Sequence, residues 1–311
     1  MTESSLFKSV RFSSEPELSV PQPITKVVSP GEITSSDDES VLRLPSSISE
    51  HEWSSPSRTI FLLDFDDTLW PTTWTARASE LKKVIGPTQQ QIKNINTALE
   101  EFLSKALKLG RVVIITLSND KWLDQHLDQY LGDVKCLFEK VEVISGRRLI
   151  IPEKDSKLND QLLSIVLKDR AMRKALKSFY CRYTGQAWHN VISIGDAYFE
   201  RDALVELASK HHSLSKVRCR AKCVTLIQEP TPEELCQELH ALTACLRDLT
   251  IFNGSLEFTL NKGVMHLEWR KWKSYLASEN ASRHERALKK SSVSNAKETD
   301  IKKKARQTAV V

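Results

Sequence analysis

Short, continuous apolar runs divide the middle of the chain. A run that is apolar at successive positions, without alternation, is typical of a strand buried on both faces. A further segment, LEFTL at 256–260, fits an edge strand. The continuous runs lie at 59–65 (TIFLLDF), 112–117 (VVIITL), 141–145 (VEVIS), 191–195 (VISIG) and 223–227 (CVTLI).

Helical periods fill the spaces between these runs. In 88–109 apolar residues recur at i, i+3 and i+4, and Gly110 closes the predicted helix. The same period recurs at 156–180, 197–210 and 232–249. Buried strands that alternate with helices predict a doubly wound α/β domain, in which helices cover both faces of a mostly parallel sheet.

The two ends of the chain have a different composition. Residues 1–57 are rich in Ser, Pro and Glu and keep no apolar period, so we predict a disordered acidic tail. Residues 263–311 begin with a Trp/Lys-rich stretch and end in a basic segment, for which we predict a helix over 264–289 followed by disorder. The predicted folded domain is therefore 58–262.

Charge is distributed unevenly along the chain. The net charge is +5, with −5 in residues 1–57 (four Lys/Arg, nine Asp/Glu) and +7 in residues 263–311 (twelve Lys/Arg, five Asp/Glu). The middle therefore carries +5 + 5 − 7 = +3, which is not the charge of a nucleic-acid-binding domain. Nucleic acid is expected to bind only through the basic tail.

Several features indicate a cytoplasmic or nuclear protein. No run approaches the ~18–20 apolar residues that span a bilayer, and the N-terminus lacks the apolar core of a secretory signal. The six cysteines are scattered, as reduced thiols usually are. The run Lys302–Lys304 is typical of a nuclear import signal and equally of a solvated tail.

Polar residues that suit a phosphate site follow three of the predicted strands. Asp64 and Asp66 follow the first, Thr116 ends the second, and Asp196 and Glu200 follow the fourth. The carboxyl ends of parallel strands meet at one edge of a sheet. Carboxylates gathered at such an edge repel one another unless a cation compensates, and Mg²⁺ prefers oxygen ligands. The sequence therefore predicts a magnesium site.

Three motifs carry a family resemblance. DFDDT at 64–68, VVIIT at 112–116 and GD-x-x-x-E at 195–200 occur in the order of the first, second and fourth motifs of the haloacid dehalogenase (HAD) superfamily. The chain resembles a poorly characterised eukaryotic subgroup of that superfamily over 59–260. The resemblance implies a HAD-like Rossmannoid sheet and a Mg²⁺-dependent phosphatase.

The resemblance also implies a role for each motif residue. Asp64 would attack phosphorus and form an aspartyl-phosphate. Asp66 would protonate the leaving oxygen and later activate water, and Thr68 would order the loop. Thr116 would donate a hydrogen bond to a phosphoryl oxygen. The implied metal ligands are Asp64, Asp66 through its backbone carbonyl, Asp196, and Glu200 through a metal-bound water.

The lysine of the third motif is ambiguous. Lys168, Lys174 and Lys177 all lie in the helical segment before the fourth motif, and we expect Lys174 to supply the positive charge at the transferring group. The chain also departs from the subgroup at Leu117, where the subgroup tends to carry Asn. This departure bears on substrate placement.

The segments between the motifs leave no room for a full cap domain. Residues 70–111 hold about one helix and a half, and residues 118–190 must supply a helix, a strand and the lysine helix. We therefore expect an open site, covered only by Trp70–Thr75 as a flap. An open site favours a large phosphorylated substrate, such as a phosphoprotein.

Two alternatives stay open. A catalytically silent module with this fold, which binds partners through its tails, would carry many of the same motifs. Lys8–Phe12 (KSVRF) resembles the short docking motif that recruits protein phosphatase 1, although five-residue patterns of this kind also arise by chance.

Overall fold

Six parallel strands form a single sheet in the order β3-β2-β1-β4-β5-β6. The computed structural model describes residues 52–80, 86–149, 158–183, 187–214, 217–260, 274–282 and 285–286. The strands are β1 (Thr59–Leu63), β2 (Arg111–Thr116), β3 (Glu142–Ser145), β4 (Asn190–Gly195), β5 (Arg220–Thr225) and β6 (Leu256–Thr259).

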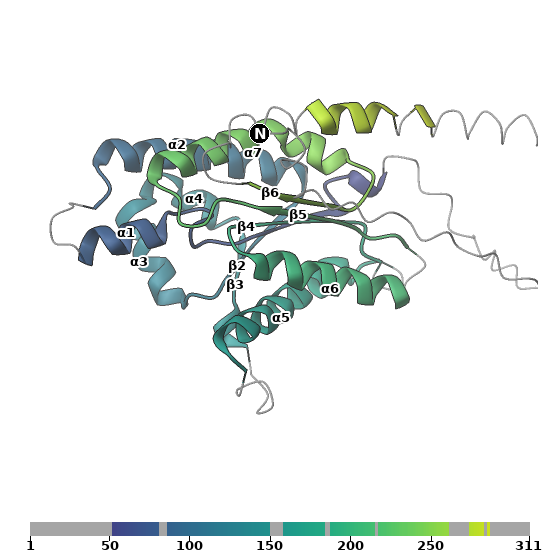
Figure 1. Ribbon diagram of the computed structural model, residues 1–311, viewed down its shortest axis with the longest axis horizontal. Coiled ribbons are helices and arrows are strands. Elements are labelled where there is room, and N and C mark those ends of the chain that lie inside the picture. The colour runs from purple at the N-terminus through teal and green to yellow at the C-terminus, as the bar shows by residue number, and fades with distance from the viewer. Residues whose placement is uncertain are drawn as a thin grey trace, which may run out of the picture.

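Helices cover both faces of this sheet. Figure 1 shows α2 and α7 side by side over one face and α5 and α6 over the other. The helices are α1 (Thr72–Glu80), α2 (Gln89–Leu109), α3 (Asp120–Tyr130), α4 (Lys135–Phe138), α5 (Asp160–Tyr180), α6 (Tyr198–Leu214) and α7 (Pro232–Ile251), with short 3-10 turns η2 (Glu52–Ser54), η3 (Gly132–Val134) and η4 (Gly146–Arg148). The predicted doubly wound parallel α/β fold is confirmed.

The strand side chains divide the core into two layers. Phe61 and Leu63 of β1 pack with α2 and α7, whereas Ile60 and Leu62 pack with α5 and α6. Successive residues of a strand point to opposite faces, so a strand covered on both faces is apolar throughout. This geometry explains the continuous apolar runs in the sequence.

Two helices that face each other begin with the same kind of cap. At the start of α2 the Thr88 hydroxyl accepts a hydrogen bond from the backbone N–H of Gln91, and at the start of α7 the Thr231 hydroxyl accepts one from the backbone N–H of Glu234. In turn, the side chains of Gln91 and Glu234 accept from the backbone N–H groups of Thr88 and Thr231. This capping box satisfies backbone N–H groups that the first helical turn leaves unpaired.

The apolar run at 223–227 missed the start of β5 at Arg220, because a buried lysine interrupts the apolar pattern of the strand. Lys222 is fully buried, and its Nζ donates to Asn190 Oδ1 at 2.6 Å and to the carbonyl of Thr250 at 3.1 Å. Burial, followed by the charge of Arg220, lowers the pKa of Lys222 well below its ordinary value. A charged residue type therefore stands inside the strand and interrupts the pattern that predicted it.

The predictions for the two tails fall mostly on residues that are not described. Residues 1–51 and 287–311 lie outside the described part of the chain, as does the Lys8–Phe12 motif. Within the predicted helix over 264–289, residues 274–282 are helical, with Leu276 buried and Asn280 bonded to the carbonyl of Asp248. In the described residues, no helix combines the length and the apolarity needed to cross a bilayer.

A buried histidine makes the stability of this fold depend on pH. His189 Nε2 lies 3.0 Å from Nη1 of Arg58, and burial, followed by the charge of Arg58, lowers the pKa of His189 from 6.5 to about 4. Between these values the unfolded chain binds a proton that the folded chain does not. The free energy of unfolding should therefore fall by about 1–2 kcal/mol as the pH drops from 6.5 to 4.

Denaturant unfolding of His189→Gln across this pH range would measure the contribution, because glutamine can still accept from Arg58 without titrating. The variant should lose less stability on acidification than the wild type. His212→Gln, at an exposed position of α6, is the matched control and should follow the wild type. Equal slopes for His189→Gln and the wild type would contradict this account.

Candidate active site

The first motif forms a turn directly after β1. The backbone N–H of Asp64 continues the sheet by donating to the carbonyl of Ile194 at 2.9 Å. Phe65, the next residue, is fully buried and packs edge-on against Trp122 at 5.7 Å between ring centroids. Since neighbouring side chains of an extended segment point in opposite directions, this anchor directs Asp64 and Asp66 away from the aromatic layer.

A buried lysine joins two of the carboxylates. Nζ of Lys168 lies 2.6 Å from Asp64 Oδ1 and 2.7 Å from Glu200 Oε1, and it donates to the carbonyl of Ile115 at 2.9 Å. The Lys168 side chain is only 1% exposed. One cation from α5 therefore links the ends of β1 and β2 to α6.

The structure does not bring Lys174, the lysine expected from the sequence, to these carboxylates. Lys174 and Lys177 are exposed on α5, whereas Lys168 is buried at the candidate site. Lys168 shares a helical face with Ala171 and Ala175, three and seven residues further on, and both are buried. Lys174 lies six residues from Lys168, which is about 240° around a helix, so it points to a different side.

The charges on Asp64 and Lys168 depend on each other. Burial raises the pKa of Asp64 to about 7, although the charge of Lys168 opposes this rise. Burial alone would lower the pKa of Lys168, but the charges of Asp64 and Glu200 raise it above its ordinary value. Lys168 therefore stays protonated at neutral pH and neutralises part of the negative charge at this edge of the sheet.

The segment after β4 supplies two further carboxylates, Asp196 and Glu200, beside Gly195. A Cβ atom at Gly195 would lie 2.7 Å from Cγ of Glu200, so only glycine lets Glu200 pack against this turn. Glu200 Oε2 is buried without a hydrogen-bond partner, and Oε1 contacts Lys168 as an ion pair without hydrogen-bond geometry. Burial and the charges of Asp64, Glu200 and Asp67 raise the pKa of Asp196 to about 9.

Hydroxyl groups surround the carboxylate of Asp66. Thr72 Oγ1 donates to Oδ1 at 2.9 Å, while Ser118 Oγ and Thr116 Oγ1 donate to Oδ2 at 2.8 and 3.2 Å. Thr116, expected at a phosphoryl oxygen, is therefore hydrogen-bonded to Asp66 in this structure. Ser118 and Thr72 were not predicted as site residues. The available signal was their position, because Ser118 lies two residues beyond β2 and Thr72 lies just after the turn of the first motif.

The segment Trp70–Thr75 is not the flap that the sequence suggested. Trp70 is fully buried and stacks on Tyr130 with 4.7 Å between ring centroids. Thr73, in the first turn of α1, donates its backbone N–H and its hydroxyl to Asp67 at 2.9 and 2.5 Å. The Asp66-Asp67 pair thus holds the start of α1 in place, and the segment is part of the packed structure.

Thr68 lies in the same turn. Its backbone N–H donates to the carbonyl of Phe65 at 3.3 Å, and its buried hydroxyl makes no hydrogen bond. Asp67, just before it, adopts a left-handed conformation with φ 53°. Backbone hydrogen bonds therefore order this turn, whereas the sequence analysis assigned that role to Thr68.

The acidic groups at this edge outnumber the cation among them. Lys168 interacts electrostatically with Asp64, Asp196 and Glu200, while Asp66 and Asp67 interact with neighbouring carboxylates of the same group. Among the residues that the structure describes, no group of three or more His, Cys, Asp or Glu is arranged to hold a metal ion by itself. Mg²⁺ commonly uses only one or two carboxylates, with waters and phosphate. The surplus of carboxyl groups over cations and the unpartnered Glu200 Oε2 fit such an ion.

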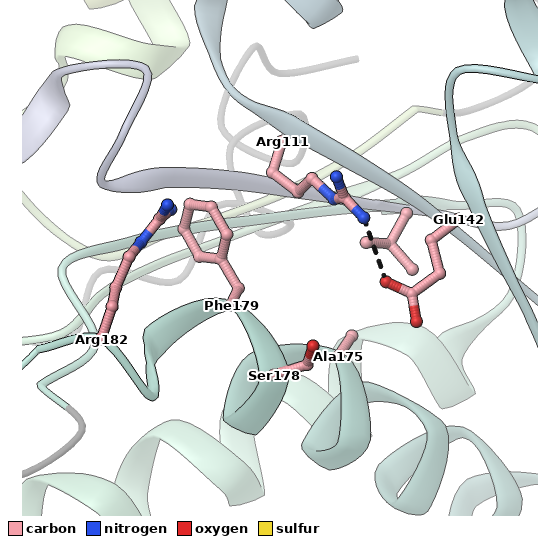
Figure 2. Close-up of a pocket in the computed structure, with 7 residues that line it drawn as sticks. Arg111, Glu142, Ala175, Ser178, Phe179 and Arg182 are labelled. Atoms are coloured by element: carbon pink, nitrogen blue, oxygen red, sulfur yellow. Dashed lines mark hydrogen bonds and ion pairs between the residues drawn. The ribbon is translucent and has the colours of Figure 1, made fainter.

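A separate pocket of about 260 Å³ lies at the amino ends of β2 and β3. Figure 2 shows Arg111 and Arg182 on two sides of it, with Phe179 between them. Arg111 pairs with Glu142 at 3.4 Å, and Arg182 lies over the Phe179 ring at 4.4 Å. Since β2 runs from Arg111 to Thr116, this pocket is at the opposite end of the strand from the carboxylates.

Comparisons with protein-family models, curated proteins and solved structures found no match to this chain. The HAD likeness therefore remains a resemblance of motifs, and the function is inferred from the site itself.

Proposed function

We propose that the protein is a Mg²⁺-dependent phosphomonoester hydrolase in which Asp64 is the nucleophile. The observation that supports this best is the contact of Asp64 with a fully buried, protonated lysine. Lys168 Nζ lies 2.6 Å from Asp64 Oδ1, at the carboxyl edge of a parallel sheet where ligands usually bind. A fixed cation beside a nucleophile stabilises the negative charge of a transferring phosphoryl group.

The proposed reaction has two displacements. In the first, a carboxylate oxygen of Asp64 bonds to phosphorus, the ester P–O bond breaks, and the leaving oxygen takes a proton from Asp66. In the second, water bonds to phosphorus and gives a proton to Asp66, while the bond between phosphorus and Asp64 breaks. Inorganic phosphate leaves, and both carboxyl groups return to their starting states.

The residues would also hold a magnesium ion. As the motif resemblance implies, its ligands would be the carboxylates of Asp64 and Asp196 and the backbone carbonyl of Asp66. Glu200, whose Oε1 lies 2.7 Å from Lys168 Nζ, would reach a metal-bound water through its unpartnered Oε2. When bound, Mg²⁺ would neutralise charge on the phosphoryl group. The surplus of carboxylates over Lys168 supports a divalent cation at this position.

The substrate is proposed to be a phosphorylated macromolecule, such as a phosphoprotein. Among the described residues, only helices and short turns connect the strands, and no separate domain is inserted over their carboxyl ends. Helices α1 and α3 are the first helices after β1 and β2, respectively, and lie beyond one end of the sheet (Figure 1). Asp64 itself is only 6% exposed, and the site reaches the surface through its half-buried neighbours Asp66 and Asp196.

The test is the capture of the covalent intermediate. The full-length protein should release phosphate from para-nitrophenyl phosphate only with Mg²⁺. After acid quenching, borohydride should convert phosphorylated Asp64 to homoserine, which mass spectrometry can locate. A protein that releases no phosphate and yields no homoserine at position 64 would be the catalytically silent module instead.

Asp196→Ala should weaken magnesium binding without harming the metal-free fold. The half-buried carboxylate faces Asp64 and Glu200, and its removal reduces repulsion among them. We expect a roughly tenfold or larger rise in the Mg²⁺ concentration for half-maximal activity, because about one carboxylate ligand is lost. The rise in melting temperature on adding Mg²⁺ should shrink in parallel, since stabilisation by a ligand grows with the logarithm of its concentration over its dissociation constant.

Asp169→Ala, which removes an α5 carboxylate paired with Arg173, is the matched control and should keep the wild-type response to Mg²⁺. A metal-free Asp196→Ala protein that unfolds much more easily than the metal-free wild type would assign Asp196 a structural role.

A further inference from the structure

Asp66 is held by three hydroxyl groups, one from the start of α1 and two from the end of β2. Thr72 belongs to the first turn of α1, Thr116 ends β2, and Ser118 follows β2. Their donor distances to the Asp66 carboxylate are 2.9, 3.2 and 2.8 Å. Two of the three bonds reach Oδ2 and one reaches Oδ1.

Ser118 is itself fixed on both sides. Its backbone N–H donates to Thr116 Oγ1 at 2.9 Å, and its backbone carbonyl accepts from Ser145 Oγ at 2.8 Å. Ser145 is the buried last residue of β3. The Ser118 hydroxyl therefore extends from a backbone held by two adjacent strands, and it has little freedom to follow Asp66 if that side chain rotates.

The hydrogen bonds also distinguish the two oxygens of Asp66. An ionised carboxylate offers about four lone-pair positions, two on each oxygen. Ser118 and Thr116 occupy both positions on Oδ2, whereas Thr72 occupies one on Oδ1. A proton on Asp66 is therefore accommodated on Oδ1 without breaking any of these bonds.

We propose that Ser118 is a positioning residue for the acid–base chemistry of Asp66, and that with Thr72 it keeps Oδ1 as the oxygen that carries the transferred proton. This inference rests on the proposed function and adds a residue that the motif resemblance does not include. Without the Ser118 hydroxyl, Oδ2 has a vacant position and the carboxylate can rotate. Proton delivery to the leaving oxygen then becomes less efficient, while attack by Asp64 is unaffected.

The test compares leaving groups that differ in their need for a proton. A dinitrophenolate leaves without protonation, whereas an alkoxide requires it. General acid catalysis contributes about 10²–10⁴-fold, and partial loss of positioning should remove part of that. We expect Ser118→Ala to lower kcat/KM for a phosphoserine peptide by about 10- to 100-fold and for dinitrophenyl phosphate by less than about threefold.

Thr72→Val provides a second variant in a different element, and it should show the same dependence on the leaving group. Ser118→Thr, which keeps the hydroxyl, should have close to the wild-type kcat/KM on the phosphoserine peptide, unlike Ser118→Ala. Thr97→Val, which removes an exposed α2 hydroxyl bonded only within its own helix, is the control and should leave both rates unchanged.

The outcomes separate the two proposals. If the wild type hydrolyses neither compound, the proposed function fails and this inference fails with it. If the wild type is active but Ser118→Ala and Thr72→Val slow both compounds equally, or slow neither, the phosphatase assignment stands and the positioning role is wrong.

Discussion

Asp64→Asn should abolish turnover. The amide keeps the shape of the side chain and an oxygen that can accept from Lys168, but it does not attack phosphorus. The value of kcat should fall by more than about 100-fold, which is a loss above ~2.7 kcal/mol of barrier stabilisation. The melting temperature should change by only a few degrees, because an amide, unlike a buried carboxylate, has no charge to desolvate.

Phosphate release and thermal unfolding of the same preparation would measure both effects. Asp169→Asn is the matched control, since it makes the same chemical change on α5 away from the strand edge. Retention of more than about a hundredth of the wild-type kcat by Asp64→Asn would sink the nucleophile assignment.

Lys168→Met should lose both activity and stability. The ammonium group lies between Asp64 and Glu200 with only 1% of the side chain exposed, so its removal leaves two buried carboxylates without a counter-charge. Loss of one partner of a buried ion pair costs about 3–5 kcal/mol. The activity should fall at least about 100-fold, since an electrostatic contact at the transferring group is removed.

A second substitution separates the two effects. Lys168→Met combined with Glu200→Gln should recover part of the stability, because one uncompensated charge is removed, but it should not recover activity. Lys174→Met, at the exposed position that the sequence favoured, is the matched control and should change the unfolding free energy by less than about 0.5 kcal/mol. An active Lys168→Met protein alongside an inactive Lys174→Met protein would reverse the assignment.

The lysine illustrates what a sequence pattern can and cannot resolve. All three candidates stand in one helix, so their place in the order of elements does not distinguish them. The structure selects Lys168 because its face of α5 packs against the sheet beside Ile115, where its ammonium group meets a carbonyl and two carboxylates. The burial of neighbouring Ala171 and Ala175 was visible as a period, but a lysine within an apolar face is more often expected to be exposed.

The Trp70–Thr75 segment shows the opposite case, in which a local pattern was misleading. Two tryptophans and several threonines after an acidic turn suggested an exposed flap. The stacking of Trp70 on Tyr130 and the bonds from Thr72 and Thr73 to Asp66 and Asp67 involve residues 6 to 60 positions apart. Only the folded chain brings these partners together.

The sequence by itself determined the class of fold and the edge of the sheet at which the acidic residues gather. Strands buried on both faces must be apolar throughout, and the residues that end parallel strands must meet at one edge, so both features follow from local pattern and from general rules of α/β folds. The tertiary structure alone decided which lysine reaches Asp64, which hydroxyls hold Asp66, and which carboxylate oxygens lack a partner. Those contacts depend on how α1, α5 and α6 pack at the strand ends, because a hydrogen bond requires atoms to approach within about 3 Å. No local period encodes that approach.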